Sequence, residues 1–296
     1  MASSSWTEAG SPIVAALQRW FDENGRALPW RASDAWGVLV SEFMLQQTPV
    51  ARVLPAWHAW MSRWPSPPDL AHASVADALR EWGRLGYPRR AARLHQTAVV
   101  ITAEHGGSVP DSEAELRALP GVGEYTAAAV MAFAHGRRSV VLDTNVRRVL
   151  ARALEGRAQQ ADHITNAERD RAASLWPPED HDSARWSAAV MEFGALVCTA
   201  RSPACGDCPI RSRCAWLAAG SPLQPTGPRR QPAYAGSDRE ARGRVLAAVR
   251  ASTTGVASAT LAREWPDREQ RKRALASLLA DGLVVRLPGG RYALPD

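Results

Sequence analysis

All four cysteines of the chain lie in one short segment, Cys198-x6-Cys205-x2-Cys208-x5-Cys214. A disulfide scaffold would spread its cysteines along the chain, whereas a tight cluster in a cytosolic protein points to metal binding. Four thiolates suit either a tetrahedral zinc ion or a cubane iron–sulfur cluster. Zinc ribbons usually carry two Cys-x2-Cys knuckles, and only one is present here. The spacing predicts a 4Fe-4S cluster that folds the loop and takes no part in catalysis.

Glu42 is a second group that could do chemistry. It sits inside an apolar run, Trp36–Gln47, which reads as a helix. Burying an ionised carboxylate there is costly, so its pKa should rise, and a carboxyl group that holds a proton can act as a general acid. Exposure to solvent or pairing with an arginine explains Glu42 equally well from its position. Glu192 repeats the pattern, because it lies in the apolar helical segment Trp186–Val197.

A phosphate-binding turn is predicted at Leu119-Pro-Gly-Val-Gly-Glu-Tyr-Thr126, between expected helices at 112–118 and 124–134. The proline stops the first helix, and Gly121 and Gly123 allow backbone conformations that other residues resist. The second helix then begins with free N–H groups, which form a seat for a phosphate. A helix–hairpin–helix of this kind holds a nucleic-acid backbone without reading its sequence.

Asp143 supplies a carboxylate soon after this hairpin. Aspartate is a common N-cap residue, and Asp143 precedes a predicted helix that carries Arg147, Arg148 and Arg152. Capping and catalysis are compatible, since a capping aspartate is held rigidly. A phosphate-binding turn beside a carboxylate suggests chemistry on DNA.

Composition agrees with such a partner without proving it. The net charge of +6 and the pI of about 9.7 suit a polyanion, although a merely basic protein would look the same. Arg89, Arg90 and Arg93 follow a turn and could contact phosphates, but a solvated helix start usually explains such a run. The sequence contains no run of 18 apolar residues and no signal-peptide pattern at Met1–Trp6. We therefore expect a cytoplasmic protein that does not contact membranes. We also expect it to be bacterial, monomeric and associated with the nucleoid in use.

The predicted elements divide the chain into a catalytic region, a linker and a small C-terminal domain. The pattern predicts an all-α fold over residues 1–219, beginning with a helix at Pro12–Glu23, and no strand before residue 280. Residues 220–238 read as a linker. Residues 239–296 predict an α+β winged-helix-like domain with a two-stranded hairpin and three helices, at 239–250, 258–265 and 267–280. Such a domain binds DNA or serves as a packing or protein contact, and the pattern favours neither.

Several motifs together resemble the A/G-specific adenine DNA glycosylases, the MutY family of the helix–hairpin–helix base-excision superfamily. The resemblance covers about residues 13–216, and Glu42 with Gln46-Gln47-Thr48 is its most specific part. The hairpin and the cysteine loop are shared with endonuclease III-like enzymes. The matching stretches are Leu28-Pro-Trp-Arg31, Ser41-Glu-Phe-Met-Leu-Gln-Gln-Thr48, Leu85-Gly-Tyr87, Leu119-Pro-Gly-Val-Gly123, Leu142-Asp-Thr-Asn-Val146, Met191-Glu-Phe-Gly-Ala-Leu-Val-Cys198 and the cysteine spacing.

The resemblance implies two helical subdomains that bind double-stranded DNA containing a mispaired adenine. One is a six-helix barrel with the hairpin, at about 34–145, and the other combines about 11–33 with the iron–sulfur region at 146–219. The adenine would be flipped out of the duplex. Glu42 would protonate it at N7, and Asp143 would stabilise the oxocarbenium-like sugar, directly or through a transient covalent bond.

The same resemblance assigns further residues to the site. Tyr125 and Asn145 would flank the catalytic sugar. The adenine pocket would be formed by Trp30, Arg31, Leu45 and Glu192. The residues that enter the stack near the orphaned base would be Gln47, Thr48, Leu85 and Tyr87, while Gly121 and Gly123 hold the DNA backbone. Core packing is the ordinary role of a single Trp or Leu, and their joint placement favours the functional interpretation.

The lysine content bears on the reaction type. Lys272 is the one lysine of the chain. Bifunctional relatives form a Schiff base through a lysine in the hairpin helix, and here that position is Tyr125. The sequence therefore predicts a monofunctional glycosylase that removes adenine opposite 8-oxoguanine or guanine and leaves an abasic site.

Two departures from the family pattern are present. Residues 239–296 are too short for the larger C-terminal domain, resembling 8-oxo-dGTP hydrolases, that family members typically carry. The preference for 8-oxoguanine is accordingly a weaker expectation than adenine excision. Thr144 stands where many members have glycine, which leaves the carboxylate of Asp143 in place.

Two other functions compete with this interpretation. An endonuclease III-like or thymine-mismatch glycosylase conflicts with Glu42 and Gln46-Gln47-Thr48, and the missing lysine argues against a lyase. A non-enzymatic iron–sulfur DNA-binding regulator that uses the C-terminal wing leaves Glu42, Asp143 and the hairpin unexplained.

Overall fold

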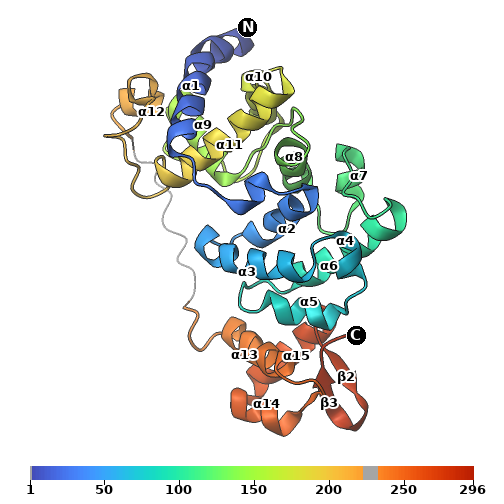
Figure 1. Cartoon of the computed structure of the whole chain (residues 1–296). Coiled ribbons are helices and arrows are strands. Elements are labelled where there is room, and N and C mark those ends of the chain that lie inside the picture. Colours follow the sequence, from blue (N-terminus) through green and yellow to red (C-terminus); the bar gives the residue numbers. More distant parts are fainter. Residues whose placement is uncertain (1, 223–232) are drawn as a thin grey trace. The chain divides into compact units, whose positions relative to one another are not determined.

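The computed structural model describes residues 2–222 and 233–296 (Figure 1). Most of the predicted linker, at 223–232, lies outside the described residues. The prediction of a mainly helical fold is confirmed, and within the described ranges no helix is long and apolar enough to cross a membrane. The described residues fall into two compact units. The first comprises those of Met1–Val38, Asp111–Arg117 and Val122–Gly227, and the second those of Leu39–Pro110, Ala118–Gly121 and Pro228–Asp296.

Four helices of the first unit share its largest core, and smaller apolar clusters lie at α8 and α12. Helix α1 contacts α9, α10 and α11, and α9 also packs against α11 and α12 (Figure 1). Ile13 and Leu17 of α1 are buried against Trp186 and Phe193 of α11. The helices of this unit are α1 (Ala2–Asn24), η1 (Pro29–Ala32), α7 (Glu113–Ala118), α8 (Glu124–Phe133), α9 (Thr144–Glu155), α10 (Asn166–Leu175), α11 (Asp180–Leu196), η2 (Arg211–Arg213) and α12 (Ala215–Ala218). Helix α1 therefore begins ten residues before the predicted start at Pro12, which lies inside it.

The second unit contains α3 to α6, which are held by buried tryptophans. Trp60 meets Trp64 and Trp82 edge to face, with ring centroids 4.7 and 5.6 Å apart. Helix α2 (Ala35–Leu45) begins in the first unit and continues into the second. The remaining helices are α3 (Val50–Arg63), α4 (Pro67–Ala71), α5 (Val75–Trp82) and α6 (Arg89–Glu104).

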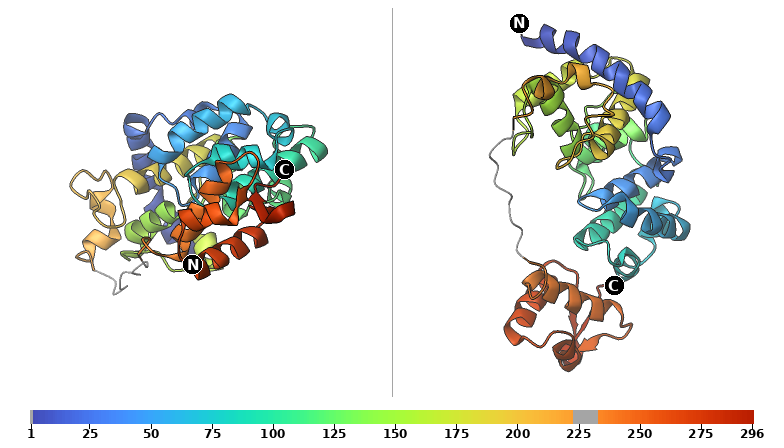
Figure 2. Two further views of the ribbon diagram at one scale, coloured as in Figure 1. Left: turned by 90° about the horizontal axis from the view of Figure 1, so that it is seen from below. Right: turned by 90° about the vertical axis from the view of Figure 1, so that its left-hand side faces the viewer.

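The C-terminal module, residues 238–294, has the winged-helix order predicted for it. Its elements are α13 (Asp238–Arg250), β1 (Val256–Ala257), α14 (Ser258–Glu264), α15 (Arg268–Ala280), β2 (Val285–Leu287), η3 (Pro288–Gly290) and β3 (Arg291–Ala293). The sheet is antiparallel with the order β1-β3-β2, so Tyr292 pairs with both Val256 and Arg286. The expectation of no strand before residue 280 was wrong, because β1 is two residues long and too short to show an alternating pattern. Figures 1 and 2 both place this module beside α5.

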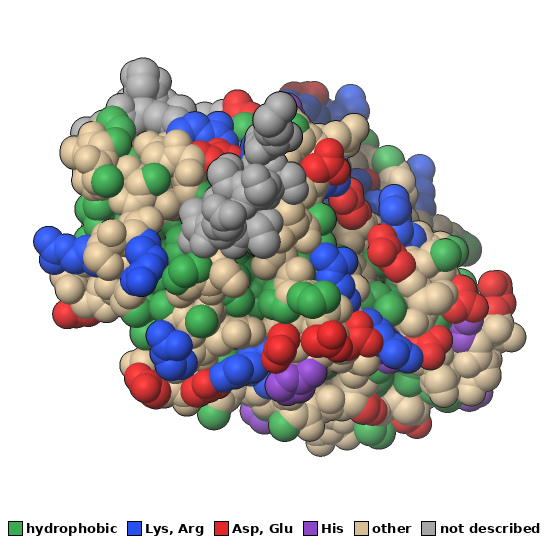
Figure 3. All heavy atoms as spheres, turned by 90° about the horizontal axis from the view of Figure 1, so that it is seen from above, with side chains coloured by type: hydrophobic (Ala, Val, Ile, Leu, Met, Phe, Trp, Pro, Cys, Tyr) green, Lys and Arg blue, Asp and Glu red, His purple; other side chains and the backbone are tan. Residues whose placement is uncertain are grey.

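Charged side chains are mixed by sign on the face shown in Figure 3. Lys and Arg side chains lie among Asp and Glu side chains there rather than gathering in one patch. The net charge of +6 is therefore not expressed as a basic surface on this face.

Candidate active site

Glu42 lies on α2 and only 5% of it is exposed. Val40, Phe43 and Met44 on the same helix are each at most 1% exposed. The sequence-based expectation of a buried acid in an apolar helix is met, and the alternative that Glu42 faces solvent is wrong.

Arg90, at the start of α6, holds the C-terminal end of the helix that carries Glu42. Its Nη1 donates to the carbonyls of Phe43 and Met44 at 2.9 and 3.0 Å and to that of Gln46 at 2.5 Å. The last carbonyls of a helix lack partners within it, and Arg90 supplies them. Arg90 is 7% exposed, and burial lowers its pKa to about 10, so it stays charged at neutral pH. Arg90 thus links α6 to the end of α2 through buried hydrogen bonds and is not placed to contact phosphates.

Two segments predicted to enter the DNA stack lie side by side in the second unit. The hydroxyl of Thr48 donates to the Leu85 carbonyl at 3.4 Å, and Arg90 bonds both Thr48 Oγ1, at 3.0 Å, and the Gly86 carbonyl, at 3.2 Å. Thr48 and Leu85 are buried, whereas Gln47 is exposed and Tyr87 is 59% exposed. Gln47 and Tyr87 both have positive φ, at 56° and 47°, a conformation that non-glycine residues adopt at a cost. Leu45 ends α2 beside this segment and is half-buried.

The hairpin between α7 and α8 needs one of its two glycines. Gly121 has φ of +81°, and a Cβ there would lie 3.1 Å from atoms of Arg93 and Phe43. Gly123 has φ of −99° and ψ of −178°, which is ordinary extended backbone, and a Cβ there would meet nothing within 4 Å. The expectation that both glycines need unusual backbone angles was therefore wrong for Gly123. Gly123 is the N-cap of α8, so this helix begins directly after the turn, as predicted.

Tyr125 lies in the first turn of α8, directly after the hairpin. Its ring is half-buried and packs against a small cluster that includes Ala128, Ala129 and Val141. The position of Tyr125 is therefore set by the hairpin turn, because α8 begins directly after that turn.

Asp143 is the N-cap of α9, as the sequence predicts. Its Oδ1 accepts from the backbone N–H of Val146 at 2.6 Å, and its Oδ2 accepts from the Asn145 side-chain amide at 2.7 Å. Burial raises the pKa of Asp143 above its ordinary 3.8, and these hydrogen bonds oppose that rise. Both carboxylate oxygens are thereby fixed in direction, and the ionised form is stabilised by donors.

Arg148 continues this network from Asn145 to the cysteine loop. Its Nη2 donates to Asn145 Oδ1 at 2.7 Å and to the Gly194 carbonyl at 2.6 Å, and its Nε donates to the Cys198 carbonyl at 2.8 Å. Helices α9 and α11 approach closely here, because a Cβ at Gly194 would lie 2.8 Å from the backbone and Cβ of Asn145. A continuous chain of hydrogen bonds therefore joins Asp143 to the first cysteine of the loop.

Glu192 forms a buried ion pair with two arginines from the start of the chain. Its Oε1 accepts from Arg26 Nε at 2.6 Å, and its Oε2 accepts from Arg26 Nη2 at 2.8 Å and Arg31 Nη2 at 3.0 Å. Glu192 is 3% exposed, and burial raises its pKa, but the two arginines outweigh this effect and the net pKa is lowered. Glu192 is thus held ionised. Trp30, beside Arg31 in η1, is buried at 7% exposure.

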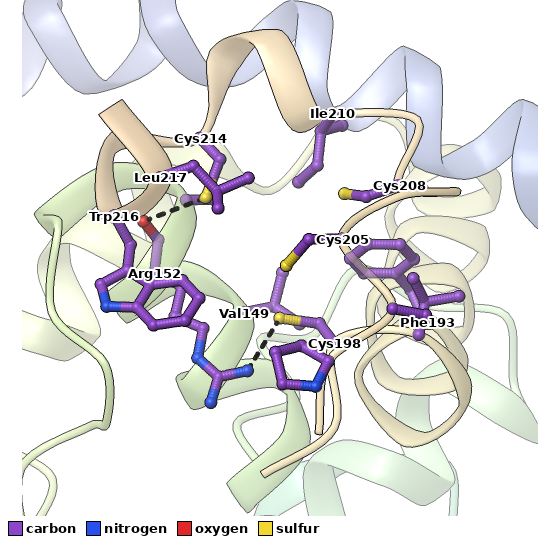
Figure 4. Close-up of a pocket in the computed structure, with 14 residues that line it drawn as sticks. Val149, Arg152, Phe193, Cys198, Cys205, Cys208, Ile210, Cys214, Trp216 and Leu217 are labelled. Atoms are coloured by element: carbon purple, nitrogen blue, oxygen red, sulfur yellow. Dashed lines mark hydrogen bonds between the residues drawn. The ribbon is translucent and has the colours of Figure 1, made fainter. Parts of the chain in front are cut away.

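The four cysteines line one pocket together with apolar side chains of α9, α11 and α12 (Figure 4). Arg152 donates to the Cys198 sulfur at 3.4 Å and to the carbonyls of Thr199 and Ala200 at 2.7 and 3.1 Å. In the described part of the chain, no three Cys, His, Asp or Glu side chains converge enough to hold a single metal ion. Four thiols that line one apolar pocket, with Arg152 directed at one of them, fit the donor set of a cubane cluster.

Comparisons with known proteins agree with this site. Residues 40–178 match the family described as HhH-GPD superfamily base excision DNA repair protein, and residues 198–214 match the iron–sulfur binding domain of endonuclease III. The chain is 52% identical over 283 residues to the adenine DNA glycosylase of Mycobacterium tuberculosis strain H37Rv, covering 94% of this chain and 92% of that protein. It is also 52% identical to the adenine DNA glycosylase of Mycolicibacterium smegmatis, covering 96% of each. The chain belongs to the adenine DNA glycosylases.

The fold of this glycosylase is also that of a solved relative. A thermostable thymine-DNA glycosylase matches with a TM-score of 0.65 and 25% identity, covering 72% of this chain and 98% of that one. The domain match at 198–214 confirms the iron–sulfur cofactor predicted from the cysteine spacing. Because 94% of this chain is aligned with the mycobacterial glycosylase, most of the C-terminal module is included in that match.

The sequence did not reveal the arginines that organise this glycosylase's site. Arg26, Arg90 and Arg148 each bond acceptors far away in the chain, and such contacts leave no local pattern. Arg148 and Arg152 are one turn apart, and both are buried at 4% and 3% exposure. Two arginines one turn apart, next to Val149 and Leu150, could have indicated a buried arginine network, since charged residues are rarely buried without partners.

Proposed function

We propose that this protein is a monofunctional adenine DNA glycosylase of base-excision repair. It hydrolyses the N-glycosidic bond of adenine mispaired with 8-oxoguanine or guanine in double-stranded DNA and leaves an abasic site. The observation that carries the proposal is that the chain belongs to the adenine DNA glycosylases. Glu42 is buried and Asp143 caps a helix, which agrees with the roles proposed for them. It acts as a monomer in the cytoplasm, on nucleoid DNA.

Glu42 and Asp143 divide the chemistry of the reaction. The adenine is flipped out of the stack, because its glycosidic bond is inaccessible within the duplex. Glu42 gives a proton to N7, the C1′–N9 bond breaks, and its electron pair leaves with the adenine. The positive charge left on the sugar is stabilised by the Asp143 carboxylate until water adds at C1′ and loses a proton.

Contacts within the first unit support the role of Asp143. A group that stabilises a cationic sugar must be ionised and fixed in place, and Asp143 receives hydrogen bonds on both oxygens. Asn145 and Tyr125 flank the sugar in this proposal. Asn145 orients the carboxylate, since it donates to Oδ2 at 2.7 Å.

The remaining site residues bind the substrate. Trp30, Arg31, Leu45 and Glu192 form the adenine pocket, in which Glu192 keeps the guanidinium of Arg31 in position through their 3.0 Å ion pair. The DNA backbone is held at Gly121 and Gly123. Near the orphaned base, the contacts come from Gln47, Thr48, Leu85 and Tyr87. We retain the predicted division into a catalytic region at 1–219, a linker at 220–238 and a C-terminal domain as part of this proposal.

The iron–sulfur cluster would be held by Cys198, Cys205, Cys208 and Cys214. When bound, it supplies a rigid cross-link of the loop and no step of base removal. Arg152 assists by directing its guanidinium to the Cys198 sulfur.

Base release on defined duplexes tests the proposal. Purified protein is incubated with duplexes that pair adenine with 8-oxoguanine, guanine, cytosine or thymine, and abasic sites are revealed with alkali. We expect release opposite 8-oxoguanine and guanine, and strand cleavage only after alkali. Strand cleavage without alkali, or trapping with borohydride, would contradict a monofunctional enzyme, and absence of adenine release from every duplex would remove the proposal.

A further inference from the structure

Within the second unit, the C-terminal module contacts the helical part around one short loop, Gly83–Pro88. Helix α13 of the module packs against α5, which ends directly before this loop (Figure 1). At the first residue of the loop, the guanidinium of Arg250 donates to the Gly83 carbonyl. Just after the loop, Arg89 pairs with Asp281 at 3.2 Å. The module therefore reaches both ends of the loop.

The two contacts differ in strength. Arg250 is half-buried, so its guanidinium is partly withdrawn from water. This burial, with the nearby charge of Arg84, lowers its pKa. A hydrogen bond from a charged donor in that setting is stronger than an exposed ion pair. Arg89 is 62% exposed, so its pair with Asp281 contributes less. Asp281 itself is 17% exposed and is also held by Arg242 of α13. We expect Arg250 to dominate.

The loop needs such support because its backbone is strained at Tyr87. Gly83, Gly86 and Tyr87 all have positive φ, at 53°, 86° and 47°. Glycine adopts a positive φ at no steric cost, whereas a non-glycine residue keeps such a conformation only where its surroundings fix it. For Tyr87 the cost is real, since a tyrosine has no glycine-like freedom, and its ring is nevertheless left 59% exposed.

Every carbonyl from Gly83 to Tyr87 accepts a hydrogen bond. Those of Arg84 to Tyr87 are served by residues of the catalytic region, namely by Arg52, Thr48, Trp82 with Arg90, and the backbone N–H of Arg90. Among the described residues, the C-terminal module supplies a side-chain partner to one of these carbonyls, that of Gly83. The module thus completes a set of contacts that is otherwise local.

We propose that the C-terminal module positions the Gly83–Pro88 loop, with Arg250 as the principal positioning residue, and so sets how strongly the enzyme holds and distinguishes mispaired DNA. This rests on the proposed function, in which Leu85 and Tyr87 of the loop lie near the orphaned base. The module then acts on the opposite-base side of the reaction through the loop, without itself touching the adenine.

Four variants of the full-length protein test this. Arg250→Ala removes the bond to Gly83, and Arg250→Lys keeps a charged donor. Asp281→Asn removes the ion pairs with both Arg89 and Arg242. Arg244→Ala is the matched control, because Arg244 lies on the same helix, is 61% exposed and has only a 4.0 Å pair with Glu240. Each protein is first checked for its thermal unfolding midpoint and its iron content.

Hydrogen exchange of the backbone amides in the peptide spanning residues 83–88, measured without DNA, reports directly how often the loop opens. We expect exchange roughly 3- to 10-fold faster in Arg250→Ala, a smaller increase in Asp281→Asn, partial recovery in Arg250→Lys and no change in Arg244→Ala. Excision kinetics are then measured on adenine opposite guanine and opposite thymine. In Arg250→Ala we expect weaker duplex binding and a smaller preference for the mismatch, with the single-turnover rate at saturating enzyme retained.

The outcomes separate the two proposals. If the unmodified protein releases no adenine, the proposed function fails, and exchange still reports on the loop. If it releases adenine but exchange in Arg250→Ala equals that in Arg244→Ala, the positioning role is wrong. Faster exchange with unchanged binding and unchanged mismatch preference would also overturn it, because the loop would then move without consequence for recognition.

Discussion

The side-chain amide of Asn145 donates to the Asp143 carboxylate, with 2.7 Å between Nδ2 and Oδ2. The other end of the same amide accepts from Arg148 at 2.7 Å, so its orientation is fixed from both sides. Since the backbone N–H of Val146 holds the second oxygen of Asp143, the carboxylate cannot rotate without losing a donor. The helix cap and the proposed catalytic group are therefore one rigid arrangement.

Replacement of Asp143 by asparagine separates its charge from its capping role. Asparagine caps helices as well as aspartate, so α9 should remain intact. We expect single-turnover adenine release to fall by about 100-fold or more, because the developing positive charge loses its partner. Binding to the mismatched duplex should be retained. Release at the unmodified rate would show that Asp143 is only a cap.

Asn145→Ala should shift the acidic limb of the pH profile of the excision rate to higher pH. Without the amide, Asp143 loses a donor that opposes the effect of burial, so its pKa rises further. The carboxylate must be ionised to act, so the acidic limb shifts to higher pH. Single-turnover rates across pH measure this, with Asn166→Ala, on an exposed helix start, as the control. An unchanged limb would mean that another group governs it.

The sequence was sufficient to predict the helices and their caps, but not the contacts between residues far apart in the chain. The helix at Glu124 and the cap at Asp143 were found because capping and hairpin residues act on their immediate neighbours. Strand β1 was missed because two residues carry no period. Glu192 looked like a second Glu42, yet it is paired with Arg26, which lies 166 residues away. Nothing local to either residue encodes that contact.

Glu192→Gln should destabilise the first unit. Breaking a buried ion pair costs about 3–5 kcal/mol, and because Arg26 and Arg31 are 35% and 29% exposed we expect about 2 kcal/mol. The folded pKa of Glu192 lies below its ordinary 4.5, so the pair stabilises above about pH 4.5 and is lost as the pH falls through the folded pKa. The difference from the unmodified protein should therefore shrink in acid.

Thermal unfolding of Glu192→Gln across pH measures this difference. Glu113→Gln serves as the control, because Glu113 is 52% exposed and its 3.8 Å pair with Arg117 should contribute under about 0.5 kcal/mol. Equal effects of the two substitutions would show that the burial of Glu192 does not matter.

Arg90→Lys should be poorly tolerated although it keeps the charge. Arg90 donates to five acceptors, on Phe43, Met44, Gln46, Thr48 and Gly86. Lysine has three donors on one nitrogen and cannot reach this set, so buried carbonyls are left without partners. We expect a loss of about 2–4 kcal/mol and slower adenine release, since the helix end that carries Glu42 is loosened. Arg93→Lys, at an exposed position, should change neither, and a similar loss there would contradict the assignment.

Gly121→Ala and Gly123→Ala form a matched pair in one hairpin. Alanine at Gly121 must adopt φ of +81° and place its Cβ 3.1 Å from Arg93 and Phe43, so we expect a loss of about 1–3 kcal/mol. Alanine at Gly123 has an ordinary φ and open space around it, so its effect should stay within about 0.5 kcal/mol. Thermal unfolding and duplex affinity are measured for both.

If the proposed backbone contact is made at Gly123, its variant loses affinity while stability is retained, because the added methyl group stands where the phosphate would approach. Unchanged affinity in Gly123→Ala would remove Gly123 from the proposed DNA contact.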